Sequence, residues 1–153
     1  MFKKILYPTD FSDVSKKALA YIKQLNPAGA EQVIIMRIIN ENKLERFSEG
    51  AAWVGMDAEE FREQTYQRLT EEANEQIKTI ETELKEAGFD TKTMVERGDP
   101  YSKILDVAEK EDVSIIILGS HGRSNLSSVL LGSVSDHIIR HARQPVLVIK
   151  RDS

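Results

Sequence analysis

The feature that most constrains this 153-residue chain is the alternation of short apolar runs with helical patterns. Five runs predict β-strands, at residues 4–7, 32–39, 89–95, 113–118 and 145–149. Three of these runs lack a clean in-and-out alternation, which is typical of strands in a parallel sheet with both faces covered. The pattern therefore predicts right-handed βαβ crossovers and an α/β fold, a three-layer α/β/α sandwich.

Four helical patterns fill the gaps between the predicted strands. Ser12 is the expected cap of the first, the second begins at about Asp57, and the third begins with Asp99 as its cap followed by Pro100. The fourth pattern runs from about residue 133 to 143. Residues 41–56 contain two glycines and the only tryptophan, and we expect a long loop there. No repeat divides the chain, so residues 1–153 are predicted to form a single domain.

Composition and charge exclude several classes of protein. With 41% hydrophobic and 30% charged residues, the chain has the composition of an ordinary globular domain. Its net charge of -4 disfavours generic nucleic-acid binding, and the absence of cysteine excludes disulfides and thiolate chemistry. The longest apolar runs are far shorter than the roughly 20 residues that a membrane span needs. We therefore expect a cytoplasmic protein with no membrane and no nucleic acid among its partners.

Two glycine-rich passages follow the fourth predicted strand, where ligands of α/β sheets commonly bind. Gly119 and Gly122 come directly after that strand, and Gly132, Ser133 and Val134 open the last helix. Glycine permits close backbone approach, and free N–H groups at a helix start attract anions, so phosphate is the expected guest. The alternative is that these glycines only form tight turns. Neither a Rossmann glycine pattern nor a P-loop with its lysine is present.

The spacing Gly119-x-x-Gly122-x9-Gly132-Ser133 resembles the nucleotide motif of the universal stress protein family. Residues 4–12 and 145–149 also resemble sequences typical of that family. Residues 38–41 are similar to the family's Val-Ile-Asp-Glu, with Asn40 replacing the acid. The resemblance covers essentially the whole chain and implies the ATP-binding branch of the family. It also implies a five-stranded parallel sheet in the order 3-2-1-4-5, which brings the loops after strands one and four together.

The resemblance implies a set of ATP-binding residues and no catalytic residue, and it leaves the metal ligands unassigned. Mg²⁺ or Mn²⁺ would be held mainly by the phosphates. Backbone around the glycines would hold ribose and phosphates, with the Ser133 hydroxyl as an added donor. Asp10 would accept from adenine or ribose, and Ile38 and Leu118 would border the base. The implied binding residues are Pro8, Thr9, Asp10, Ile38, Leu118, Gly119, Gly122, Arg123, Gly132, Ser133 and Val134.

Other polar residues near the motif have two readings each. His121 is more often a surface or hydrogen-bonding residue than a base. Arg123 can either reach a phosphate or point into water. His137 and His141 lie one helical turn apart and could bind a metal, but no third ligand is suitably spaced, and a solvated helix face is favoured. Asp10 could be only a turn or capping residue.

Three functions are compatible with these observations. The first is an ATP-binding stress-response regulator or switch, with at most slow or partner-stimulated ATP hydrolysis, because no residue is placed to orient water. The second is an interaction module whose glycine loops are structural. Members of the family pair the strand that corresponds to residues 145–149 across a homodimer, and we expect the same pairing here for either of these two functions. An unidentified protein partner is compatible with both functions. The third, a flavodoxin-like carrier, needs aromatic residues beside a flavin, and the relevant loops offer only Phe11.

The segment 41–56 has two possible roles as a loop. It could close over bound nucleotide with Trp53 in the lid, or it could pack on a dimer surface.

Overall fold

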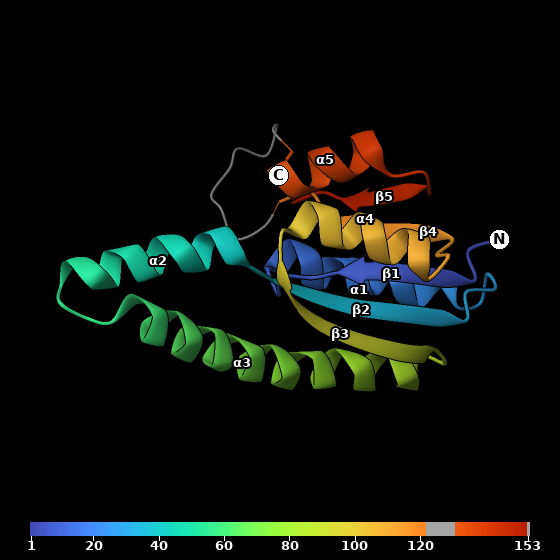
Figure 1. Ribbon diagram of the computed structural model, residues 1–153. Helices are drawn as coiled ribbons and strands as arrows, with labels where there is room; N and C mark the ends of the chain where they lie inside the picture. The colour runs from blue at the N-terminus through green and yellow to red at the C-terminus, as the bar shows by residue number, and fades with distance from the viewer. Residues whose placement is uncertain (122–130, 153) are drawn as a thin grey trace.

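The computed structural model of the chain describes residues 1–121 and 131–152. Its five strands form one parallel sheet in the order β3-β2-β1-β4-β5, which confirms the expected topology (Figure 1). The elements in chain order are β1 Lys4–Pro8, α1 Asp13–Leu25, β2 Gln32–Asn40, α2 Glu41–Trp53, α3 Ala58–Glu86, β3 Asp90–Gly98, α4 Pro100–Lys110, β4 Ile115–Gly119, α5 Ser133–His141 and β5 Val146–Ile149.

Helices cover both faces of the sheet, as the continuous apolar runs predict. The pleat of β1 shows the division, because Ile5 and Tyr7 pack with residues of α1 and α3, whereas Leu6 packs with residues of α4 and α5. All three side chains are fully buried. The architecture is therefore the three-layer α/β/α sandwich expected from the sequence.

The predicted helix starts are confirmed by their capping hydrogen bonds. Ser12, Asp57 and Asp99 each accept a bond from the backbone N–H three residues further along, at 3.3, 3.0 and 3.3 Å. Pro100 occupies the first turn of α4, where a missing N–H costs nothing. At the end of α3, Gly88 adopts a φ of +95°, which is the left-handed conformation that favours glycine after a helix.

The expectation of a long loop at residues 41–56 is wrong, because residues 41–53 form α2. The side chain of Asn40 caps this helix by accepting from the backbone N–H groups of Asn42 and Lys43, at 3.0 and 3.4 Å. The buried residues of α2 recur at helical spacing, and they are Leu44, Ser48 and Ala51. Only two of these three residues are apolar, so the apolar residues of this segment show only a weak helical period in the sequence.

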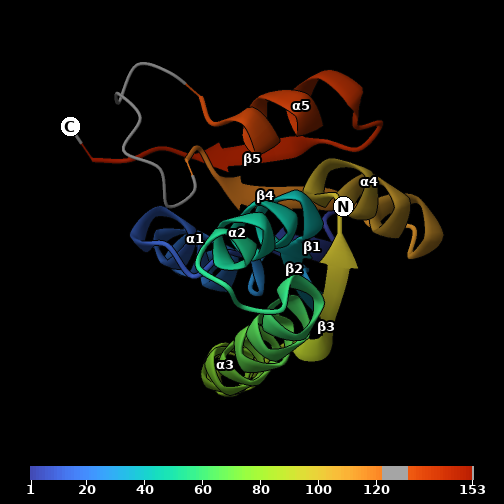
Figure 2. The same cartoon turned by 60° about the vertical axis from the view of Figure 1, so that its left-hand side comes forward.

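Helix α2 and the first part of α3 form a hairpin that projects beyond the carboxyl ends of the strands (Figures 1 and 2). Trp53 ends α2 at the far tip of this hairpin and is 90% exposed. Whether this segment closes over a bound nucleotide with Trp53 or packs on a dimer surface stays a prediction. Within the described parts of the chain, no helix is both long and apolar enough to cross a membrane.

Candidate functional site

A cavity of about 290 Å³ opens at the carboxyl ends of the strands, where the strand order reverses. It is lined by the loop after β1, the end of β2, the start of α4, the end of β4 and the start of α5. The structure brings nine of the eleven predicted binding residues to its wall: Pro8, Thr9, Asp10, Ile38, Leu118, Gly119, Gly132, Ser133 and Val134. The other two, Gly122 and Arg123, lie outside the described residues.

The cavity has an apolar side. Met36, Ile38, Ile104 and Leu118 line it and belong to the core cluster beneath α4 and α5, and Val134 packs against that cluster. Apolar walls of this kind suit an aromatic ring, while a few polar groups fix its orientation. The cavity can therefore accept a planar base against its apolar side.

Hydrogen bonds fix the turn that follows β1. Thr9 Oγ1 accepts from the backbone N–H of Phe11 at 3.0 Å and from Ser15 Oγ at 2.7 Å. Asp10 Oδ1 accepts from the backbone N–H of Ser12 at 3.0 Å. Phe11 has a φ of +63°, an uncommon backbone conformation for an aromatic residue. This network holds a strained turn at the mouth of the cavity, as often occurs in ligand-binding loops.

The buried Tyr7 braces the same turn from beneath. Its hydroxyl donates to the backbone oxygen of Ser15 at 2.7 Å. Burial raises the pKa of the Tyr7 hydroxyl, and its hydrogen bond with the side-chain hydroxyl of Ser15 partly offsets that rise. Tyr7 therefore stays protonated at neutral pH and acts as a structural donor.

The start of α5 presents backbone donors to the cavity. Among the described residues, no side chain caps this helix, and Gly132 occupies the cap position. Ser120 O accepts from Gly132 N at 2.7 Å and from Ser135 Oγ at 2.8 Å, which ties the helix start to the end of β4. The exposed Ser133 and the neighbouring Val134 follow in the first turn. A helix start held in this way favours a bound anion through its N–H groups and its dipole.

Both described motif glycines have a structural reason to be glycine. A Cβ on Gly119 would lie 2.9 Å from Val14 Cγ1 and 3.1 Å from Ser15 N, because α1 packs directly on the end of β4. A Cβ on Gly132 would lie 3.1 Å from the backbone oxygen of Ser120. These glycines are explained by packing alone, so a ligand is indicated by the cavity and its polar wall and not by the glycines.

The three histidines differ in their surroundings. His121 is only 4% exposed and lines the cavity. Its Nδ1 lies 2.8 Å from Ser120 Oγ, so His121 is a buried hydrogen-bonding residue and not a surface residue. His137 stacks between Tyr101 and His141, with ring centroids 4.7 and 4.1 Å apart. Across residues 1–121 and 131–152, no three His, Asp or Glu side chains are grouped to hold a metal ion.

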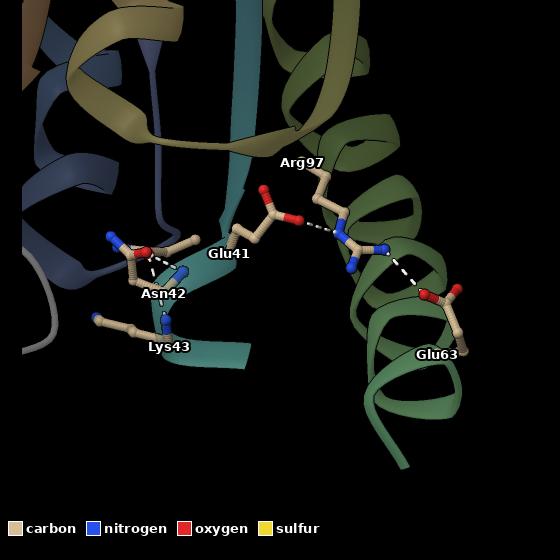
Figure 3. A network of polar contacts seen from close by, with 6 residues as sticks. Glu41, Asn42, Lys43, Glu63 and Arg97 are labelled. Atoms are coloured by element: carbon tan, nitrogen blue, oxygen red, sulfur yellow. Dashed lines mark hydrogen bonds and ion pairs between the residues drawn. The ribbon is translucent and has the colours of Figure 1, made fainter. Parts of the chain in front are cut away.

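Sequence reasoning missed several residues of the cavity wall, and Lys43 is the most consequential. It lies in the first turn of α2, within the segment expected to be a loop. The neighbouring Glu41 instead extends toward Arg97, whose Nε is 3.1 Å from its carboxylate, and Arg97 Nη1 is 3.0 Å from Glu63 (Figure 3). The hydrogen bond with Glu63 is the main cause of a raised pKa for Arg97. The other missed lining residues include Ser15, Arg37, Asn40 and Pro100.

Comparison with known proteins identifies the family. The family model described as "Universal stress protein family" matches residues 1–150. The chain belongs to this family. It is similar to universal stress protein MJ0577 of Methanocaldococcus jannaschii, with 42% identity over 99% of this chain and 96% of the relative. The solved structure of MJ0577 matches with a TM-score of 0.89 and 40% identity, covering 100% of this chain and 99% of the other.

Two more distant solved structures of universal stress proteins contain adenine nucleotides. One is in complex with cAMP, at 22% identity and a TM-score of 0.60, with 97% of each chain covered. The other, from Archaeoglobus fulgidus, is in complex with dAMP, at 17% identity and a TM-score of 0.61, with 98% of each chain covered. For this universal stress protein, likeness at these identities shows the fold alone.

Proposed function

We propose that this universal stress protein binds ATP in the cavity at the carboxyl end of its sheet and acts as a nucleotide-dependent regulator or switch in a stress response. The observation that carries the proposal is the cavity itself. It gathers residues from β1, β2, β4 and α5 that are far apart in the sequence, and nine of them match the residues implied by the family motif. Its position at the switch point is where ligands of open α/β sheets bind.

The chemistry of the wall supports this ligand. Adenine would lie against Ile38 and Leu118, with Asp10 accepting from the ribose or the adenine amino group. The phosphates would lie at the start of α5, near the backbone of Val134 and the hydroxyl of Ser133. Mg²⁺ or Mn²⁺ would be held mainly by the phosphates, the arrangement common for nucleotide-bound Mg²⁺.

The cAMP and dAMP complexes add independent support, because the same fold accommodates an adenine nucleotide in each. The ligand class common to both is an adenine nucleotide. We carry over to this chain the ligand class alone, and none of the protein–ligand contacts of those two structures.

Binding rather than turnover is the proposed core of the function. Among the described residues of the wall, Asp10 and His121 are the groups able to accept a proton from water. Both already take part in hydrogen bonds, Asp10 with the backbone of Ser12 and His121 with Ser120. Any hydrolysis is therefore proposed to be slow or stimulated by a partner.

The test is calorimetric titration of the purified chain with ATP, GTP and adenosine, each with Mg²⁺ and with Mn²⁺. We expect saturable binding of ATP at one site per chain and weaker binding of adenosine, which lacks phosphates. Assay of ADP in the same samples measures turnover. If no nucleotide binds, the interaction module becomes the better account, because the packing of Gly119 and Gly132 is explained without a ligand.

We also propose a homodimer formed through β5. This strand lies at one edge of the sheet and carries no charge, whereas β3 at the other edge carries several charged residues. An apolar edge with unpaired backbone groups invites pairing, and two-fold antiparallel pairing satisfies both copies. The further prediction that the protein resides in the cytoplasm stays untested.

Replacing Leu147 by lysine is expected to convert this dimer to monomer. Leu147 is 36% exposed, whereas Val148 packs against the core cluster beneath α4 and α5, so a change at 147 disturbs the fold less. Sedimentation velocity at micromolar concentration should show a dimer for the wild type and a monomer for Leu147→Lys. Ile139→Lys, on the exposed surface of α5, is the control for added charge. A monomeric wild type would contradict the proposal.

A further inference from the structure

The tip of the α2–α3 hairpin exposes a cluster of large apolar side chains. We define the tip as residues 47–61, which include the outer part of α2, the connecting turn and the first turn of α3 (Figures 1 and 2). Its apolar residues Phe47, Trp53, Val54 and Met56 are 51–90% exposed. Exposed apolar clusters mark interaction sites, and tryptophan is enriched at the energetic centres of interfaces. The tip therefore has the character of a contact surface.

The tip is also acidic. Residues 47–61 contain Glu49, Asp57, Glu59 and Glu60 and no lysine or arginine. All four carboxylates belong to exposed residues, so negative charge accompanies the apolar cluster. Like charges repel, which disfavours contact between two tips and contact with an anionic membrane surface. The surface that fits the tip is apolar and carries positive charge.

A surface of this kind lies elsewhere on the same chain. A groove of about 680 Å³ lies between α1 and α3. Its apolar lining consists of Phe11, Leu19 and Ala20 on one side and Ile80 on the other. This volume is typical of ligand pockets and is large enough for an aromatic side chain with its neighbours.

The charged residues of the groove leave it positive. Lys23 Nζ lies 2.8 Å from Glu83 Oε2, and these two charges compensate each other. Lys16 also lines the groove, is exposed, and forms no ion pair with any residue in the described ranges. The groove is therefore complementary to the tip both in its apolar lining and in the sign of its charge.

The tip cannot reach the groove of its own chain. Helix α3 is continuous from Ala58 to Glu86, and the groove begins at Gln76. At about 1.5 Å per residue, the helix separates the tip from the groove by roughly 27 Å. A tip that fills this groove must therefore come from a second copy. Pairing through β5 leaves the tip free, since β5 lies at the opposite edge of the sheet from β3, on which α3 packs.

We propose that two copies of this chain associate by inserting the hairpin tip of one copy, led by Trp53, into the groove between α1 and α3 of the other. Trp53 would lie against Phe11 and Ile80 of the second copy, and the carboxylates of the tip would lie near Lys16. The apolar contact supplies most of the affinity, and the charges orient the two copies. Because the contact joins two different surfaces, it closes at two copies only when it is reciprocal, and otherwise extends into a chain of copies.

The test uses Trp53 as the reporter, because it is the only tryptophan in the sequence. Its emission maximum should shift to shorter wavelength as wild-type concentration rises from about 1 to about 200 μM, a range suited to a weak contact. Ala20→Glu places a negative charge at an exposed position in the groove and should abolish the shift. The matched control is Gln24→Glu, which adds the same charge four residues further along α1, outside the groove lining, and should keep it.

Mixing two variants tests whether the tip enters the groove. Ala20→Glu keeps the tip but has a blocked groove, and Trp53→Ser keeps the groove but has no tryptophan. Excess Trp53→Ser added to dilute Ala20→Glu should shift the emission of Trp53 to shorter wavelength. The protein that carries both substitutions should cause no shift, because its groove is blocked as well.

Every other outcome overturns the inference. A wild-type emission that stays constant with concentration excludes the contact, and a shift caused instead by phosphatidylcholine vesicles assigns the tip to a membrane. A shift that persists in Ala20→Glu assigns the tip to a different surface of the second copy. Equal shifts in the two mixtures exclude the groove. Because Trp53 and Ala20 do not line the cavity proposed for ATP, failure of this inference leaves the nucleotide site untouched.

Discussion

Replacing Ser133 by aspartate is expected to weaken ATP binding by about 100-fold while leaving the fold intact, because the new carboxylate would stand where the phosphates bind. Two like charges about 4 Å apart repel by roughly 1–4 kcal/mol near a protein surface, and ATP carries several. Ser133 is exposed at the first position of α5, where a negative charge stabilises a helix by about 0.3–1 kcal/mol. Calorimetric titration and thermal unfolding measure the two effects.

Two variants control for this result. Ala58→Asp places the same charge at the first position of α3, away from the cavity, and should leave ATP affinity unchanged within about twofold. Ser133→Ala removes only the hydroxyl and should weaken ATP binding by about 2- to 12-fold, the usual contribution of one hydrogen bond. The phosphate site would be misplaced if Ser133→Asp bound ATP as tightly as the wild type while remaining folded.

Replacing Gly119 by alanine is expected to lower the free energy of unfolding by about 1–3 kcal/mol, the usual cost of overpacking. The new methyl group would lie 2.9 Å from Val14 Cγ1 and 3.1 Å from the backbone nitrogen of Ser15. That nitrogen donates to the capping Ser12 at 3.3 Å, so it cannot move without disturbing the start of α1. Urea denaturation of the nucleotide-free protein measures the change.

The matched control for Gly119 is Gly50, which lies inside α2 with no atom within 4 Å of its would-be Cβ. Gly50→Ala should raise the free energy of unfolding by about 0.5–1 kcal/mol, because alanine is the better helix former. The two variants make the same chemical change, and we expect them to change the free energy of unfolding in opposite directions. Equal effects of the two would contradict the close packing of α1 on the end of β4.

Most of the fold could be predicted from the sequence because local and tertiary preferences agree. The strands at 32–39 and 113–118 are apolar along nearly their whole length, and the sheet buries them on both faces. Ser12, Asp57 and Asp99 carry short polar side chains immediately before helical patterns, and each caps a helix. Where a capping residue precedes a clear period, the two signals reinforce each other.

Helix α2 could not be predicted in the same way. Its buried face includes Ser48, and Phe47 and Trp53 are 62% and 90% exposed, so hydrophobicity and burial do not coincide. The helix is held by its cap at Asn40 and by packing against α3, and neither is visible as an apolar period. Lys43 escaped attention for this reason, since its approach to the cavity depends on α2 being helical.

The site could be predicted in part. The family motif led to residues that the structure places around one cavity, but it did not reveal why the glycines are needed. Gly119 and Gly132 are required by contacts with Val14 and Ser120, which come from other elements and follow from tertiary packing alone. For the same reason Gly132→Val would be a poor probe of the phosphate site, because its added atoms would press on the backbone of Ser120.

The most direct test of the nucleotide site is the nucleotide content of gently purified protein, measured by acid extraction and chromatography for the wild type and Ser133→Asp. The account predicts ATP, or ADP where slow turnover has occurred, with the wild type and none with the variant. A wild type that carries no nucleotide and takes up none from added ATP with Mg²⁺ or Mn²⁺ would contradict it, as would equal nucleotide content in the two proteins.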